Sequence, residues 1–312
     1  MSINHLLVLP RLQIQNANTI SSSLTYGFPA ITAFLGFMWA LERKLKQCGQ
    51  EFEDIELNNI GVVCHDYQEQ VSQAGFTKSF NLTRNPVDKT GATSAINEEG
   101  RIHLNISLII GIYNDAWENN EPLKQQQILK IAEVVNQMRI AGGTIIPPQH
   151  PQLKRYQAKV YLPKDTDYLK KQLLPGFALV CRDDLLDSRH RELLAKDDQA
   201  TRLDAWLSLC RINWRYNEQA NDGKGEWQHD RAGLGWVVPI PVGYGALTEL
   251  QPAGTVVSAR DNTTPFRFVE SLYSIGQWVS PLKINNIEQL LWYSSADTEQ
   301  GLYRCYNQFL TN

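Results

Sequence analysis

The segment RIHLNISLIIGIY at residues 101–113 limits the possible folds of this chain more than any other stretch. Polar and apolar residues alternate strictly from Arg101 to Leu108, and a period of two indicates a β-strand with one face in the core. The stretch FTKSFNL at residues 76–82 also has strand character, and a polar, turn-rich segment separates the two. We therefore expect a long β-hairpin at about residues 76–106.

The segments around this hairpin follow an order known from other proteins. Pro10 lies inside the first apolar segment, where it requires an edge position or a bulge. Strands are expected at residues 6–15, 60–65 and 143–147, and amphipathic helices at 29–46 and 124–138, the second ending before Gly142-Gly143. The order is β-α-β-β-α-β, so we expect an α+β fold with the ferredoxin-like arrangement of many RNA-binding modules.

The second half of the chain has a less regular pattern. We expect residues 1–150 to form the RNA-binding core and residues 151–312 to form an insertion and a C-terminal region packed on it. The segment 150–171 is the most basic, with six Lys or Arg against two Asp. Residues 183–214 favour helix, with a core stripe of Leu203, Trp206, Leu207 and Cys210, and a final helix is expected around 266–275. The glycine-rich segment 233–245 is expected to be buried.

Composition excludes several classes of protein. The chain has 312 residues and a net charge of −3, so a nucleic-acid site here must be a local patch. No stretch approaches the roughly 18 apolar residues of a membrane helix. The five cysteines are odd in number and widely spaced, which argues for free, buried thiols and against a disulfide framework. We expect a cytoplasmic protein that does not bind membranes.

The motifs of common enzymes are absent from the sequence. There is no P-loop, no dinucleotide fingerprint and no cysteine spacing for structural zinc, so we predict no catalytic residue, no metal and no cofactor. One alternative stays open. His103 lies beside Arg101 on the polar face of its strand, and His103 or His5 could act as a general base in metal-independent RNA cleavage.

The segment after the first strand is unusually rich in neutral polar groups. Amides at Gln13, Gln15, Asn16 and Asn18 can bind base edges and sugar hydroxyls. The helix that begins after Pro29 would present free N–H groups toward the same place. The same residues could instead cap their own turns, and spacing alone does not separate the two interpretations.

A series of blocks resembles one CRISPR-associated family, the second subunit of the Csy (type I-F) surveillance complex, which is a Cas-five-like group. The blocks occur in order from Leu6 to Arg304, so the resemblance covers most of the chain. They are LLVLPRLQIQNAN, YGFPAITAFLGF, FNLTRNP, EEGR, MRIAGGTI, LLPGFALV, LCRINW, GWVVPIPVGYGAL, ARDNTTPFRFVE, LLWY and GLYR.

The resemblance implies a non-catalytic role in antiviral defence. Such a subunit pairs with the large subunit of the complex and grips the 5′ handle of the CRISPR RNA (crRNA). The pair caps a filament of backbone subunits, contacts the adjacent backbone subunit and supports recognition of double-stranded target DNA through the complex. The implied fold is an RNA-recognition-motif (RRM) core with a long β-hairpin thumb, and segment 233–245 resembles a loop laid against RNA. The aromatic signature of ordinary RRMs is missing from residues 101–113.

Combining the residues with the resemblance, we predict a groove for the crRNA handle. Two other interpretations remain open: an RNA-processing endoribonuclease of the same fold superfamily, and an RNA-binding module unrelated to CRISPR. The residues predicted to bind RNA are Arg11, Gln13, Gln15, Asn16, Asn18, Arg84, Asn85, Arg139, Gly142, Gly143, Arg260 and Arg267.

Overall fold

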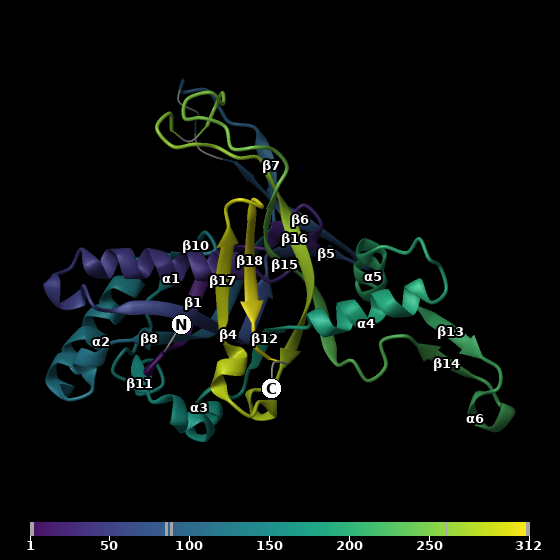
Figure 1. Ribbon diagram of the computed structural model, residues 1–312, viewed down its shortest axis with the longest axis horizontal. Helices are drawn as coiled ribbons and strands as arrows, with labels where there is room; N and C mark the ends of the chain where they lie inside the picture. Colours follow the sequence, from purple (N-terminus) through teal and green to yellow (C-terminus); the bar gives the residue numbers. More distant parts are fainter. Residues whose placement is uncertain (1–2, 85–86, 88–89, 260, 310–312) are drawn as a thin grey trace. The chain divides into compact units, whose positions relative to one another are not determined.

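The computed structural model describes residues 3–84, 87, 90–259 and 261–309. The chain divides into two compact units, residues 1–177 and residues 178–312. Each unit combines helices with an antiparallel sheet, which confirms the prediction of an α+β protein (Figure 1).

The first unit is built on an antiparallel sheet with the strand order β9-β10-β1-β8-β4. Strand β11 pairs with the N-terminal half of β1, and β10 pairs with its C-terminal half. The strands are β1 (His5–Asn18), β4 (Glu56–Glu69), β8 (Arg101–Tyr113), β9 (Arg139–Ile140), β10 (Gly143–Ile146) and β11 (Lys159–Tyr161), with a small hairpin of β2 (Ile20–Ser22) and β3 (Thr25–Tyr26).

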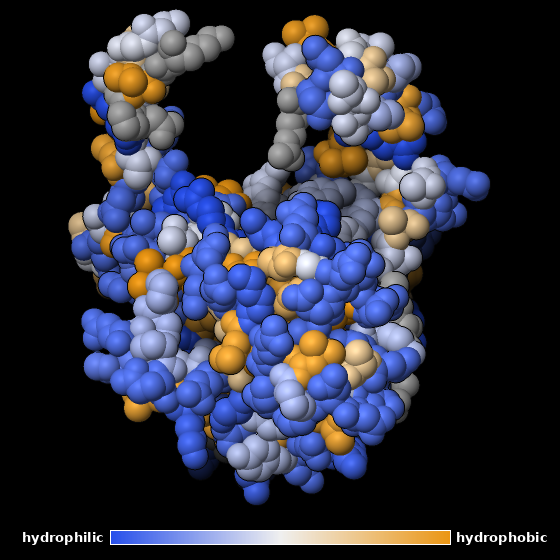
Figure 2. Space-filling model, turned by 90° about the vertical axis from the view of Figure 1, so that its left-hand side faces the viewer, coloured by the Kyte–Doolittle hydropathy of each residue, from blue (hydrophilic) through white to orange (hydrophobic). Residues whose placement is uncertain are grey.

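Two long helices, α1 (Ile31–Lys46) and α2 (Glu121–Asn136), contact each other. Helix α1 also packs against β4 and β9, and α2 against β10. Their inner faces carry buried apolar residues at the spacing of three and four that predicted them, including Phe34, Met38, Ile131 and Val135. Their outer side is mostly hydrophilic with scattered apolar patches (Figure 2).

The segment in which the thumb was expected contains a three-stranded sheet of β5 (Val71–Ala74), β6 (Thr77–Arg84) and β7 (Ile96–Glu99), which is called the thumb below. Strands β6 and β7 pair from Asn81 opposite Glu99 to Arg84 opposite Ile96. The hairpin was expected over 76–106, but Arg101 already begins β8, which pairs with β1 and β4 in the main sheet.

Strand β1 contains two bulges in its pairing with β8. The register shifts between Leu9 and Leu12 and again between Ile14 and Ala17. Within these intervals Arg11 and Asn16 have positive φ angles of 54° and 59°. The bulge that Pro10 predicted is therefore present, in a strand that is paired on both sides.

The second unit has the strand order β12-β16-β15-β18-β17. Helices α4 (Asp183–Leu194) and α5 (Arg202–Leu209) pack together on this sheet, and the Trp206 indole Nε1 donates to the Ser274 carbonyl at 3.0 Å. The strands are β12 (Phe177–Cys181), β13 (Trp214–Asn217), β14 (Glu226–His229), β15 (Trp236–Ala246), β16 (Val269–Val279), β17 (Trp292–Asp297) and β18 (Leu302–Asn307).

Several short helices complete the chain. They are α3 (Thr166–Gln172) and α6 (Ala220–Gly223), with 3-10 turns at Gln50–Phe52, Asp115–Trp117, Pro163–Asp165, Pro281–Lys283 and Ile287–Leu290. None of the helices that the structure describes is long and apolar enough to cross a bilayer. All five cysteines are free, but only Cys181 and Cys305 are buried and Cys48 is exposed, so the expectation of buried thiols was wrong for Cys48.

Three expectations for the second unit were wrong in whole or in part. The final helix expected at 266–275 is strand β16, because its helix-like apolar spacing is overridden by pairing with β12 and β15. The glycine-rich segment is a loop only at its start, since residues 236–246 form β15 between two partner strands. The core stripe expected in α5 is confirmed for Trp206, which is buried, but was wrong for Leu203 and Leu207, which are exposed; Cys210 is half-buried, and Leu209 is buried instead.

A matched pair of glycine substitutions tests the close approach of β1 and β10. A Cβ atom on Gly143 would lie 2.6 Å from Ile14 Cγ2 and 2.8 Å from the Ala17 backbone nitrogen. Gly143→Ala should therefore lower the free energy of unfolding by about 1–3 kcal/mol. Gly36→Ala, in α1 with open space around its Cβ position, should raise it by roughly 0.5–1 kcal/mol. Urea titration of both variants measures the difference, and equal stabilities would contradict the assigned packing.

Candidate nucleic-acid interface

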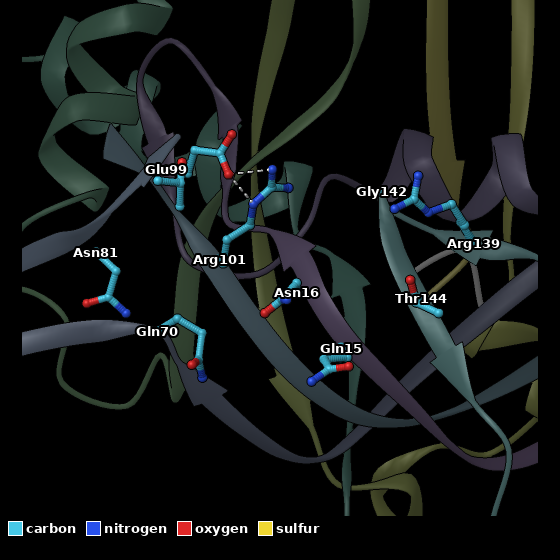
Figure 3. A pocket seen from close by; sticks show the side chains of 10 residues that line it. Gln15, Asn16, Gln70, Asn81, Glu99, Arg101, Arg139, Gly142 and Thr144 are labelled. Atoms are coloured by element: carbon cyan, nitrogen blue, oxygen red, sulfur yellow. Dashed lines mark hydrogen bonds and ion pairs between the residues drawn. The ribbon is translucent and has the colours of Figure 1, made fainter. Parts of the chain in front are cut away.

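A polar pocket with a volume of about 350 Å³ opens where β1, the β9–β10 turn and the thumb strands meet. Every lining residue except Gly142 is polar or charged. Figure 3 shows Arg139, Gly142 and Thr144 on one side, Gln70, Asn81 and the Glu99–Arg101 pair on the other, and Gln15 and Asn16 between them. Thr83 completes the lining.

The second bulge of β1 places Asn16 in this pocket. A bulge leaves a backbone N–H without a partner in the ladder, and an unpaired N–H is costly when it is buried. The N–H of Asn16 donates to His103 Nδ1 at 3.1 Å. His103 on β8 therefore fixes the backbone conformation that places Asn16 on the pocket lining beside Gln15.

The β9–β10 turn forms one side of the pocket. Ala141 and Gly142 both have positive φ angles, of 49° and 77°, so the chain reverses within two residues. The carbonyl of Ala141 accepts the N–H of Asn18 at 2.9 Å, which ties this turn to the end of β1. Arg139 and Thr144 are register partners across the turn, and both line the pocket.

The thumb base forms the opposite side. Arg101 Nε and Nη2 donate to Glu99 Oε2 at 3.0 and 2.8 Å, so this cation is already neutralised. Asn81 Oδ1 accepts from the Ser72 hydroxyl at 3.1 Å. The backbone N–H of Gln70 donates to the Arg101 carbonyl at 2.8 Å. This bond joins the chain entering the thumb, between β4 and β5, to the chain leaving it, at the start of β8.

Four side chains in the pocket have unused hydrogen-bonding capacity. Gln15, Asn16, Arg139 and Thr144 are exposed, and their side chains have no hydrogen-bond or ion-pair partner among the residues that the structure describes. Amides and a hydroxyl can contact base edges and ribose hydroxyls, and one free guanidinium can bind a phosphate. The pocket therefore fits a nucleotide better than an apolar ligand.

The first bulge of β1 is held in the same way. The N–H of Arg11 donates to Ser107 Oγ at 3.0 Å, and Ser107 Oγ lies 2.7 Å from His65 Nε2. His65 Nδ1 lies 2.6 Å from the Pro175 carbonyl oxygen, which can only accept. The neutral ring is thus protonated at Nδ1 and accepts the Ser107 hydroxyl proton at Nε2. Arg11 Nη2 donates to the Leu174 carbonyl at 2.9 Å.

The His65 ring is kept neutral by its surroundings. Its pKa is lowered to about 4: burial is the main cause, the hydrogen bond to the Pro175 carbonyl opposes it, and the neighbouring Arg11 cation adds to the lowering. A neutral ring is what the hydrogen bond from Ser107 requires, so the charge state and the bulge support each other.

Comparison with known proteins gives a consistent assignment. The family model for CRISPR-associated protein (Cas_Csy2) matches residues 7–305. The chain is 44% identical over 314 residues to CRISPR-associated protein Csy2 of Pseudomonas aeruginosa (strain UCBPP-PA14), covering 96% of this chain and 94% of that protein. The chain belongs to the Csy2 family. The resemblance inferred from the sequence blocks is confirmed.

The structure brings four of the predicted RNA-binding residues of this Csy2-family chain together. Gln15, Asn16, Arg139 and Gly142 line the one pocket. They come from segments more than 120 residues apart along the chain, and the pairing of β1 with β10, with Gln15 opposite Thr144, joins them.

Other predicted residues on and near β1 lie elsewhere. Arg11 lines a separate cavity. Gln13 is exposed on β1 but is not among the residues that line the polar pocket. Asn18 caps its own turn, with Nδ2 donating to the Ile20 carbonyl at 2.7 Å, and Gly143 allows close packing on Ala17. The capping interpretation of the amide-rich segment is thus confirmed for Asn18, and nucleotide binding by Gln15 and Asn16 stays a prediction.

The remaining predicted residues are not in this pocket. Arg84 is exposed at the end of β6 and is not among its lining residues. Arg267 belongs to the second unit, where Nη1 donates to the Thr298 carbonyl at 3.2 Å. Asn85 and Arg260 lie outside the described residues. Helix α1 contributes no lining residue, so the expected role of its N–H groups has no support.

The histidines of the endoribonuclease alternative both have structural contacts. His103 Nδ1 accepts the Asn16 N–H, and His5 is 3% exposed with its ring edge-on to Trp117. Among the residues that the structure describes, no three His, Cys, Asp or Glu side chains are grouped as a metal site requires. The described residues of this Csy2-family chain thus show both histidines in structural contacts.

Sequence reasoning missed the thumb side of the pocket. Gln70, Asn81, Thr83 and the Glu99–Arg101 pair were not predicted, although Arg101 stood out on the polar face of its strand. The sequence pattern could have predicted these residues only in part. Pairing within the hairpin places Asn81 opposite Glu99. A local pattern does not show which face of the hairpin turns toward β1.

The acid sensitivity of the first bulge can be measured. Because the folded-state pKa of His65 is about 4 and the ordinary value is 6.5, the unfolded chain binds a proton before the folded chain does. Stability from this group is complete above pH 6.5 and is lost as pH falls toward 4, by about 1–2 kcal/mol after allowing for partial exposure.

Denaturant titrations at several pH values test this sign. His65→Gln should have a shallower loss of stability between pH 6.5 and 4 than the parent protein. His150→Gln removes an exposed histidine and should follow the parent protein. An identical pH dependence of the parent protein and His65→Gln would show that this ring is not held neutral.

Proposed function

We propose that the chain is a non-catalytic subunit of the type I-F CRISPR (Csy) surveillance complex and that its polar pocket holds part of the crRNA 5′ handle. Membership of the Csy2 family supports the role in the complex. The observation that carries the RNA assignment is the group of uncommitted donors and acceptors at Gln15, Asn16, Thr144 and Arg139. Such a set recognises nucleotide edges and one phosphate without performing chemistry.

The topology supports a finer classification of the first unit. Strands β10-β1-β8-β4 are neighbours in that order, and α1 and α2 form the two helical connections. We infer a ferredoxin-like, RRM-type core with the β5–β6–β7 sheet as its thumb. In this assignment the core occupies about residues 1–150, and residues 151–312 are additions to it.

The proposed partners follow from this role. The handle is held together with the large subunit, the chain caps the filament beside the adjacent backbone subunit, and target double-stranded DNA is met through the complex. Base pairing of the crRNA then supplies target specificity. The protein subunits recognise the backbone and the shape of the nucleic acid rather than its sequence.

Substitutions in the polar pocket should separate phosphate binding from sequence recognition. Arg139→Ala should weaken binding of a handle oligonucleotide about tenfold or more, since a charge-assisted hydrogen bond is worth roughly 1.5–3 kcal/mol. The slope of log affinity against log salt should become shallower by about 0.7. Gln15→Ala should instead reduce the preference for the handle over a scrambled sequence and leave the salt slope nearly unchanged.

The measurement is a salt titration of both oligonucleotides against the chain purified with the large subunit. Arg43→Ala and Gln126→Ala are matched controls, because both residues occupy exposed positions on α1 and α2, outside the polar pocket. If Arg139→Ala and Gln15→Ala behave like these controls at every salt concentration, the handle is bound elsewhere.

A further inference from the structure

A second cavity in the first unit has a different character. Its volume is about 440 Å³, and it lies against the first bulge of β1. Five cations line it: Arg11 on β1, Lys154 and Arg155 in the turn before β11, Lys159 on β11, and Lys171 on α3. No carboxylate is among its lining residues. In a chain whose net charge is −3, this is a strong local concentration of positive charge.

The carboxylates nearest in sequence do not neutralise these cations. Asp167 pairs with Lys170 at 3.2 Å, and Asp165 accepts the Leu162 N–H at 3.2 Å. Among the described residues, none of the five lining cations forms an ion pair. Burial lowers the pKa of Arg11, and the neighbouring Arg155 cation adds to this lowering while Tyr156 opposes it. The five charges therefore repel one another without a counter-charge from the protein.

The cavity combines the turn before β11 with residues of β1, β8, β11 and α3. Strand β11 pairs with β1, with Lys159 opposite Val8. Arg11 is held by two hydrogen bonds, from its N–H to Ser107 and from its guanidinium to Leu174. The Arg155 guanidinium carbon lies 4.8 Å from the centre of the Tyr156 ring, so that side chain lies over an aromatic face.

We propose that this cationic cavity binds the phosphodiester backbone of a nucleic acid, without regard to sequence and separately from the polar pocket. Uncompensated Lys and Arg side chains gain most from a ligand with repeated negative charge, and release of its counterions favours binding. Lysine and arginine donors to phosphate carry no sequence information. The inference goes beyond the proposed function, because it concerns other residues and does not require the handle to occupy the polar pocket.

The test compares two variants that remove the same charge. Lys154→Gln/Lys171→Gln changes the cavity, and Lys44→Gln/Lys164→Gln removes two exposed lysines outside it. Each is titrated with salt, as the full chain alone and with the large subunit, against handle RNA, a scrambled RNA and a DNA duplex. For each phosphate that the cavity variant no longer neutralises, the log–log slope should flatten by about 0.7 on single strands, or about 0.9 on duplex.

The outcomes distinguish the source of the backbone. An equal loss of affinity on both RNAs supports the proposal with an RNA strand as the ligand, and a loss confined to the duplex supports it with DNA. Lys154→Arg/Lys171→Arg should retain binding in either case. Equal slopes for the cavity and control variants on all three ligands would overturn the proposal.

A protein ligand for the same cations is also testable. Loss of association with the large subunit, with nucleic-acid binding unchanged, would overturn the proposal and indicate an acidic protein surface instead. If the proposal for the cationic cavity is overturned, the proposal for the polar pocket still stands. The polar pocket is tested by a different measurement, the preference of Gln15→Ala for the handle over a scrambled sequence.

Discussion

The pairing of β1 with β8 is the interaction on which the first unit depends. The apolar residues of β8 pack in the core. Two of its polar residues accept hydrogen bonds from the bulges of β1. Ser107 accepts the backbone N–H of Arg11, and His103 accepts that of Asn16. Without these acceptors each bulge would leave an unsatisfied N–H, at a cost of roughly 1–3 kcal/mol if buried. Because each bulge directs one residue into a cavity, both cavities are consequences of how β8 satisfies β1.

In the proposed function, the two cavities divide the recognition of a nucleic acid into separate tasks. The polar pocket has neutral amides and hydroxyls with one free guanidinium, at Arg139, because Arg101 is already paired with Glu99. The other cavity has five cations and no carboxylate. Neutral groups discriminate by geometry, whereas cations respond to charge wherever it is placed. A protein with a small net negative charge can therefore bind a polyanion through local groups alone.

Periodicity predicted those parts of the fold in which one face meets the core. The strand predicted at 101–113 and the helix predicted after Pro29 are both present. Pro10 has no N–H to donate to the ladder, and the bulge that this predicted is also present. Segment 266–275 failed because apolar spacing of three and four also occurs in a strand buried between two neighbours. The pocket was recovered only on the β1 and β10 sides. Its thumb side depends on pairings between distant segments. The basic segment 150–171 is likewise brought to the first bulge only by the pairing of β11 with β1.

The spacing of the two bulges has a consequence for avidity. Arg11 and Asn16 are five residues apart on one strand, a separation on the order of 16 Å at about 3.3 Å per residue. A polynucleotide that reaches both cavities makes its second contact intramolecularly, at an effective concentration in the millimolar range for a short flexible connection. Two individually weak subsites then act as one strong one, and a strand too short to span them loses this gain entirely. The chain would thus measure the length of its ligand as well as its charge.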